Sequence, residues 1–146
     1  MSTTRGQQGW NPMEELRRMR TRGLADALGI EIVELTPERV VATMPVDDRT
    51  RQPFGILHGG ASVALAETAV SLGAWLNIDG EQQAAVGLEI NANHIRAVSS
   101  GTVRVVATPI HRGRTTHVWS AEIRDEKERL VCISRCTLAI VPRHAT

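Results

Sequence analysis

Runs rich in β-branched residues alternate with short turns through the second half of the chain. Glycine, serine or charged residues punctuate these runs, which cover residues 84–95, 102–110, 116–123 and 130–141. This texture predicts four consecutive antiparallel strands. Nearer the N-terminus, residues 29–35 and 39–46 flank the turn residues Thr36, Pro37 and Glu38. They predict a β-hairpin.

Two helices are expected. Residues 59–76 carry apolar or small side chains on all sides, interrupted by Glu67, which predicts a helix buried inside the fold. Near the N-terminus, Asn11 is a candidate N-cap with Pro12 at the first helical position and Glu14 three residues beyond the cap. This second helix is expected to run to about Leu24. Its apolar side would use Leu16, Met19 and Leu24.

Together these elements predict one α+β domain over residues 11–142, in which a six-stranded antiparallel sheet wraps a central helix. Residues 1–10 are small and polar and are expected to form a mobile leader. The polar stretch of residues 47–57, with Pro53 and Gly55, reads as a loop that leads into the central helix.

Composition narrows the functional classes. The chain has 146 residues and a formal net charge of +1, so no global field would attract nucleic acid or an anionic membrane. Aromatic residues make up only 3%, which predicts an aliphatic core and argues against base-stacking surfaces.

Cys132 and Cys136 lie four residues apart in an expected strand, roughly 13 Å at about 3.3 Å per residue, so they cannot bridge each other. The sequence contains no signal-peptide pattern and no uninterrupted apolar span, from which we expect a cytoplasmic protein with reduced thiols.

Glu67 is the sharpest anomaly because burial of an unpaired carboxylate is costly. The structural alternative is a satisfied core glutamate, paired with an arginine across an interface. Ser71 lies one turn further along the same helix face. Glycines 59 and 60 would leave backbone N–H groups accessible at the positive end of the helix. These amides could bind a developing oxyanion while Glu67 activates water or attacks a carbonyl.

Each neighbouring residue also has a structural explanation. Gly59 and Gly60 alone could form a tight turn, and His58 and Gln52 could be structural or solvated, although both lie just before the helix and could orient a carbonyl or water. A thioester suits such a site, since a thiol leaves without a strong general acid. The chain lacks G-x-S-x-G, phosphate-binding glycine motifs and metal-binding motifs, and its five histidines are scattered, so we expect neither serine-hydrolase chemistry nor a metal.

The segment RQPFGILHGGASVALAETAVSLGAW, residues 51–75, closely resembles the active-site segment of hotdog-fold acyl-CoA thioesterases. The similar group comprises the phenylacetate-pathway, enterobactin-proofreading and menaquinone-pathway enzymes, related to the Arthrobacter-type 4-hydroxybenzoyl-CoA thioesterases. The resemblance extends through MPVDDRT, VGLEINANHIRAVSSG, HRGRT and the last strand.

The resemblance implies a hotdog fold that hydrolyses acyl- or aroyl-CoA without a cofactor, CoA being part of the substrate. It implies that Glu67 is the general base or nucleophile, that Gln52 and His58 position water and thioester, that the Gly59 amide polarises the carbonyl, and that Ser71 is accessory. It places substrate contacts at Gly60, Gly87, His94, Ile95, Arg96, Ala97, His111, Arg112, Gly113, Arg114, Thr115 and Thr116.

Arg112 and Arg114 in a glycine turn, with Arg96 elsewhere, could meet nucleotide phosphates, although a charged turn is ordinarily just solvated. Relatives often have His-His-Arg-Pro where residues 94–97 read His-Ile-Arg-Ala, which is a departure. The resemblance also implies homodimers with the site at the interface, commonly paired into homotetramers.

Two alternatives stay open. A hydratase or dehydratase of acyl thioesters on the same fold would also use a histidine and a carboxylate, although the Q-P-F-G-x-x-H-G-G spacing favours hydrolysis. A non-catalytic acyl-CoA sensor would keep the CoA groove but needs an output module. No pair of helices with a basic DNA-binding face precedes the domain.

Overall fold

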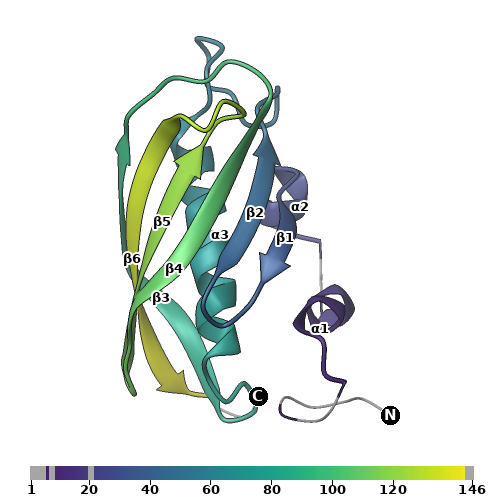
Figure 1. Cartoon of the computed structure of the whole chain (residues 1–146), viewed down its shortest axis with the longest axis vertical. Coiled ribbons are helices and arrows are strands. Elements are labelled where there is room, and N and C mark those ends of the chain that lie inside the picture. The colour runs from purple at the N-terminus through teal and green to yellow at the C-terminus, as the bar shows by residue number, and fades with distance from the viewer. Residues whose placement is uncertain (1–5, 7–8, 20–21, 144–146) are drawn as a thin grey trace.

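The computed structural model describes residue 6, residues 9–19 and residues 22–143, which form one sheet with helices on one side (Figure 1). The elements, in chain order, are α1 Pro12–Met19, α2 Leu24–Ala27, β1 Glu31–Leu35, β2 Val40–Pro45, α3 Gly59–Leu76, β3 Gln83–His94, β4 Thr102–Arg112, β5 Thr116–Arg124 and β6 Leu130–Pro142. The chain has the hotdog fold, a long helix against a six-stranded antiparallel sheet.

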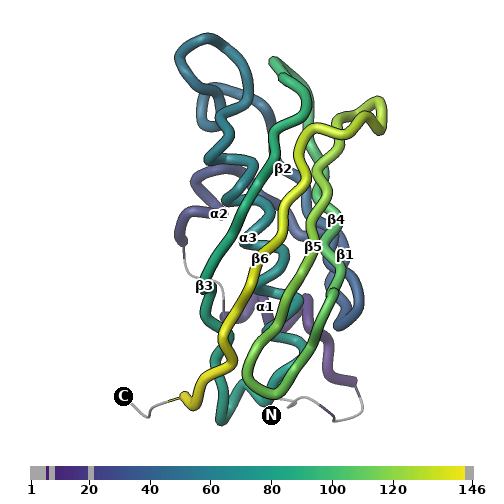
Figure 2. The backbone as a smooth tube through the Cα atoms, turned by 90° about the vertical axis from the view of Figure 1, so that its left-hand side faces the viewer, coloured from purple at the N-terminus to yellow at the C-terminus, as the bar shows by residue number. Residues whose placement is uncertain are grey.

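The order of strands across the sheet is β1, β2, β4, β5, β6, β3, and every neighbouring pair is antiparallel. The predicted β1–β2 hairpin is confirmed. The four predicted strands are confirmed as β3 to β6, of which β4, β5 and β6 are neighbours in the sheet in that order. β3 pairs with β6 at the far edge of the sheet, beside α3 (Figure 2).

One face of α3 is packed against the sheet through small side chains. Gly73 faces Trp119 of β5 so closely that a Cβ atom at position 73 would lie 2.5 Å from the indole ring. Trp119 is the largest fully buried side chain among the described residues, and it belongs to the same buried cluster as the aliphatic residues Leu65 and Ile123. The predicted aliphatic core therefore contains one buried tryptophan. The indole ring fits there because position 73 of the helix opposite it has no side chain.

The other face of α3 is only half-buried in a single chain. The fully buried positions are Ala61, Ser62, Leu65, Ala66, Ala69, Val70, Gly73 and Ala74, which share one stripe of the helix. Ala64, Glu67, Thr68 and Ser71 lie on the opposite, half-exposed side. The expectation of a helix buried all round is thus wrong for one chain, because the sheet curves over one side of the helix only.

The N-terminal helix begins as predicted. The Asn11 side chain accepts a hydrogen bond from the N–H of Met13 at 2.9 Å. The helix does not run on to Leu24, because α1 ends at Met19 and Gly23 is extended, with φ −158° and ψ −157°, before the short α2. Of the expected apolar side, Leu16 packs against the core while Met19 and Leu24 are exposed.

The remaining expectations concern the leader, the two cysteines and membrane-spanning segments. Most of the predicted leader lies outside the described residues, but the ring of Trp10 lies 6.3 Å from that of Trp75 on α3. Cys132 and Cys136 are free and buried, as their spacing predicts. No helix among the described residues is long and apolar enough to cross a membrane.

Candidate active site at the N-terminus and open face of α3

The first turn of α3 leaves one backbone donor open. The His58 ring caps the helix, its Nδ1 accepting a hydrogen bond from the N–H of Gly60 at 2.8 Å. The N–H groups of Ala61 and Ser62 both donate to the carbonyl of His58, at 3.0 and 3.3 Å. Within the described part of the chain, the Gly59 N–H has no partner. It is the free donor at the positive end of an 18-residue helix.

The loop before α3 is held in place by buried and backbone hydrogen bonds. Thr50, 1% exposed, donates through its hydroxyl to the carbonyl of Pro45 at 2.7 Å, and its own carbonyl accepts from the N–H of His58 at 2.8 Å. The N–H of Leu57 donates to the carbonyl of Val98 at 2.7 Å. The position of His58 is therefore fixed by neighbours on both sides.

His94 lies beside this helix end. A Cβ atom at position 59 would be 2.9 Å from Nε2 of His94, so the imidazole rests against the bare backbone of Gly59. His94 ends β3 and is exposed, as are Ile95, Arg96 and Ala97 after it. The structure therefore brings His58, Gly59 and His94 together.

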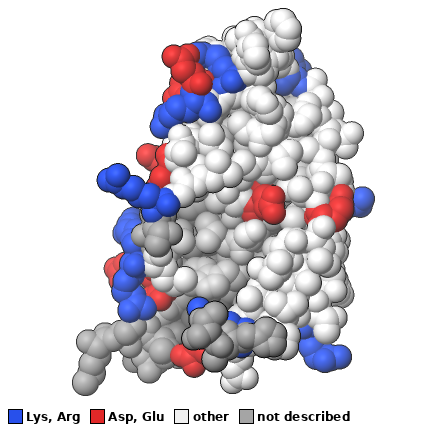
Figure 3. Space-filling model, turned by 180° about the vertical axis from the view of Figure 1, so that it is seen from behind, with Lys and Arg blue, Asp and Glu red and all other residues white. Residues whose placement is uncertain are grey.

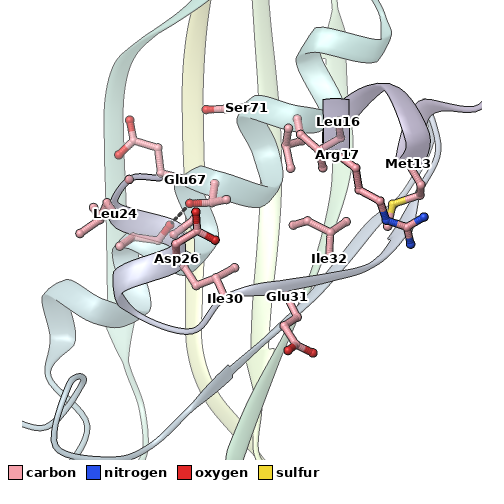
Figure 4. A pocket seen from close by; sticks show the side chains of 15 residues that line it. Met13, Leu16, Arg17, Leu24, Asp26, Ile30, Glu31, Ile32, Glu67 and Ser71 are labelled. Atoms are coloured by element: carbon pink, nitrogen blue, oxygen red, sulfur yellow. Dashed lines mark hydrogen bonds between the residues drawn. The ribbon is translucent and has the colours of Figure 1, made fainter. Parts of the chain in front are cut away.

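Glu67 reaches out from the open face of α3, with Ser71 one turn further on, and both extend to the same side of the helix (Figure 4). Glu67 is half-exposed, which corrects the expectation of a buried carboxylate. Among the described residues of one chain, none forms an ion pair with Glu67. The Glu67 Oε1 atom lies 2.9 Å from the position that a Cβ atom of Gly87 would occupy.

Glu67 and Ser71 line a cavity of about 690 Å³ between α3 and the N-terminal segment. Its walls are mainly aliphatic and include Met13 and Leu16 of α1 and Ile32 of β1 (Figure 4). The sequence did not connect α1 with the site, because only folding brings this segment across α3. The amphipathic pattern of α1 could have indicated that this helix packs against another part of the fold.

The Glu67 carboxylate also affects a thiol on the neighbouring strand. The pKa of Cys136 is raised to about 11, first by burial and then by the negative charges of Glu67 and Glu89. Because the thiolate is the reactive form of cysteine, Cys136 is inert at neutral pH. It belongs to the buried apolar core.

Gln52 lies apart from this cavity. Its side-chain Oε1 accepts a hydrogen bond from the N–H of Phe54, which leaves its amide N–H groups free to donate. It lines a separate surface depression with Asp48, Arg51 and Ser99. Within one chain, Gln52 and Glu67 are not brought together.

The hairpin His111–Thr116 lies at the opposite end of the molecule (Figure 2). Arg112 donates at 3.1 Å to Oδ1 of Asn77, the C-cap residue of α3. Because an 18-residue helix is roughly 27 Å long, Arg112 is far from Arg96, which lies near the beginning of α3. The predicted basic cluster of Arg112 and Arg114 with Arg96 is therefore not formed within one chain.

One buried histidine, His117, was not singled out from the sequence. His117 of β5 is 2% exposed, and its Nδ1 lacks a hydrogen-bond partner among the described residues, as does Nε1 of Trp119. The pKa of His117 is lowered by burial, and further by His111 and Arg112. The strand alternation marks these positions as inward-facing, but it carries no information on their polar partners.

Comparison with known proteins places the chain in a family. Residues 54–132 match the family model described as the thioesterase superfamily. The chain is 50% identical over 129 residues to a 1,4-dihydroxy-2-naphthoyl-CoA hydrolase of Escherichia coli, covering 88% of this chain and 94% of that protein. It is 48% identical over 130 residues to the proofreading thioesterase EntH of Cronobacter turicensis, covering 88% and 93%.

Comparison with solved structures also finds thioesterases. A mutant thioesterase from Pseudomonas aeruginosa superposes with a TM-score of 0.87 at 46% identity, covering 93% of this chain and 97% of that one. The matched residues include the helix that carries Glu67 and its N-terminal glycines. The chain belongs to the thioesterase superfamily.

Proposed function

We propose that this protein hydrolyses acyl- or aroyl-CoA thioesters to the free acid and CoA. The observation that carries the proposal is the pairing, on one helix, of an unpartnered N-terminal amide at Gly59 with a cavity-lining carboxylate at Glu67. A thioester carbonyl needs these two groups, an oxyanion donor and a base or nucleophile. The name of the Escherichia coli relative, a 1,4-dihydroxy-2-naphthoyl-CoA hydrolase, supports CoA thioesters as the substrate class.

In this proposal each residue of the site has a defined role. The Gly59 N–H is the donor to the developing oxyanion, and Glu67 either removes a proton from water or attacks the carbonyl. Because Nδ1 of His58 accepts from Gly60, the ring proton lies on Nε2, from which it can donate to the thioester or to water. The amide N–H groups of Gln52 are likewise available, and Ser71 is an accessory donor on the cavity wall.

We propose further that the working unit contains two copies of the chain. Gly59 and Glu67 are eight residues apart, roughly 12 Å along the helix axis, and the carboxylate is turned towards Gly87. Two α3 helices running antiparallel across a twofold axis would bring Glu67 of one copy to Gly59 of the other.

Two surface features favour such a dimer. β3 is an edge strand on which Val86 is 49% and Leu88 66% exposed. The face seen from behind is largely uncharged, with most charged side chains towards its margins (Figure 3). A second copy could also supply the hairpin His111–Thr116 and its arginines to the CoA end of the site. Pairing of two dimers into a tetramer is the further expectation from the family resemblance.

The proposed activity is tested by the release of free CoA, detected with a thiol reagent. The substrates are straight-chain, branched, phenylacetyl, benzoyl and hydroxynaphthoyl thioesters of CoA. We expect hydrolysis of at least one class, and loss of that activity in Glu67→Ala with an unchanged circular dichroism spectrum. Full activity of Glu67→Ala, or no CoA release by the wild type with any substrate, would refute the proposal.

The proposed dimer is tested by mixing two inactive variants, Glu67→Ala and Gly59→Pro, after joint unfolding and refolding. If the carboxylate and the amide come from different copies, each mixed dimer contains one intact site, and a twofold dimer at random assortment recovers about one quarter of the wild-type activity. If both groups come from one copy, every site in the mixture is defective and no activity returns.

A further inference from the structure

Gly87 is a glycine whose backbone conformation does not require glycine. It lies inside β3, opposite Leu138 of β6, and is absent from the described residues with positive φ. Glycine in a strand interior is unfavourable, because it loses more conformational freedom on folding than a residue with a side chain. The reason for a glycine at position 87 must therefore be the space that its side chain would occupy.

The carboxylate of Glu67 occupies that space. A Cβ atom at position 87 would lie 2.9 Å from Glu67 Oε1 and 4.0 Å from its carboxyl carbon, and no other described residue outside the local backbone comes within 4 Å. An approach of 2.9 Å is closer than a carbon and an oxygen can tolerate. Any side chain at position 87 would displace the carboxylate from β3.

Two further features lie next to this space, a buried cysteine of β6 and an irregularity in β3. Cys136 of β6 lies close enough to Glu67 for the carboxylate to raise its pKa, although burial has the larger effect. The register of β3 shifts between Gly87 and Glu89, so Leu88 has no partner on β6 and the strand is locally irregular at the slot. The Glu67 side chain thus lies over a bare, irregular piece of the edge strand.

We propose that Gly87 is a positioning residue, whose missing side chain provides the slot that holds the Glu67 carboxylate against β3 in its reactive orientation. The proposal rests on the catalytic role of Glu67 proposed above. It differs from the CoA contact that the family resemblance implies at Gly87, because a CoA contact acts on substrate binding whereas a slot for Glu67 acts on the chemical step.

The test is the variant Gly87→Ala in wild-type and in Glu67→Ala backgrounds. Because the displaced atom is the end of a flexible side chain, the variant is expected to fold with a melting temperature close to that of the wild type. A crystal structure of the variant should show the carboxylate moved away from β3. Since a misplacement of about 1 Å can cost roughly 100-fold in rate, kcat should fall by about 10- to 100-fold with little change in KM.

In the Glu67→Ala background, which lacks the carboxylate, the same substitution should leave the dissociation constant of CoA, measured by isothermal titration calorimetry, unchanged. A CoA contact would instead raise KM in the wild-type background and weaken CoA binding in both backgrounds, which overturns the proposal. So would an unmoved Glu67 carboxylate in the crystal structure, or an unchanged kcat with a moved one. A wild type that hydrolyses no thioester would refute the proposed function itself, and the positioning role with it.

Discussion

The free amide of Gly59 can be deleted without disturbing the helix that presents it. Gly59 is the first residue of α3, where proline is favoured because its missing N–H has no helical partner. The residue before it, His58, has φ −68° and ψ 129°, the extended conformation that a following proline requires. Gly59→Pro therefore removes the proposed oxyanion donor and keeps the start of the helix.

The magnitude follows from the loss of one hydrogen bond to the transition state. Removal of one such donor costs about 10²- to 10³-fold in kcat, or about 2.7–4 kcal/mol. The matched control is Gly59→Ala, which keeps the N–H but introduces the same Cβ atom, 2.9 Å from Nε2 of His94. Both variants push the exposed His94 ring aside, so the ratio of their kcat values isolates the amide.

The assay is steady-state CoA release by the two variants with the best substrate of the wild type, together with thermal unfolding. We expect Gly59→Pro to be about 10²- to 10³-fold slower than Gly59→Ala in kcat, with both variants folded. Equal kcat values for the two variants would refute the assignment of the oxyanion donor to the Gly59 N–H.

Two predictions concern the packing beneath the site. Gly73→Ala should lower the free energy of unfolding, measured in urea titrations, by about 1–3 kcal/mol. The reason is that the new Cβ atom would lie 2.5 Å from the Trp119 ring, and the core cannot expand freely. A gain in stability would contradict this packing. The lowered pKa of His117, caused by burial and then by His111 and Arg112, means that the folded state binds fewer protons than the unfolded state. The free energy of unfolding should therefore fall as the pH drops below about 6.5, and His117→Gln should reduce that slope; an unchanged slope would show that His117 does not cause it.

The parts of the fold that sequence predicts well are those with local causes. The bounds of α3 are those expected, because His58 and the two glycines mark its start and the apolar run ends at Leu76. The Asn11 cap is confirmed for the same reason. Strand alternation also locates β3 to β6 within a residue or two.

The parts that were not predicted depend on contacts between distant segments. Nothing local in β3 indicates that it pairs with β6 and not with β4, since both choices bury the same alternating side chains. The half-exposed state of Glu67 follows from that topology, because the sheet covers only one face of α3. The contact between Glu67 and Gly87, 20 residues apart, is equally invisible until the two elements are placed together.

The residues of the candidate site show the same contrast between local and long-range causes. The residues next to the start of α3, His58 and Gly59, are adjacent in sequence and are found together, and His94 joins them at the end of β3. Gln52 and the hairpin His111–Thr116 lie away from Glu67 within one chain. Sequence motifs identify the residues of the candidate site, but they do not show where folding places these residues relative to one another.

The most direct test of the account is kcat/KM for CoA-thioester hydrolysis by the wild type and by Glu67→Gln, which keeps the shape of the side chain and removes its charge. The matched control is Glu81→Gln, the same change at an exposed position in the turn after α3. If Glu67 is the base or nucleophile, Glu67→Gln loses about 10²- to 10⁴-fold in kcat/KM while Glu81→Gln keeps the wild-type value. Hydrolysis by Glu67→Gln at the wild-type rate would contradict the central claim.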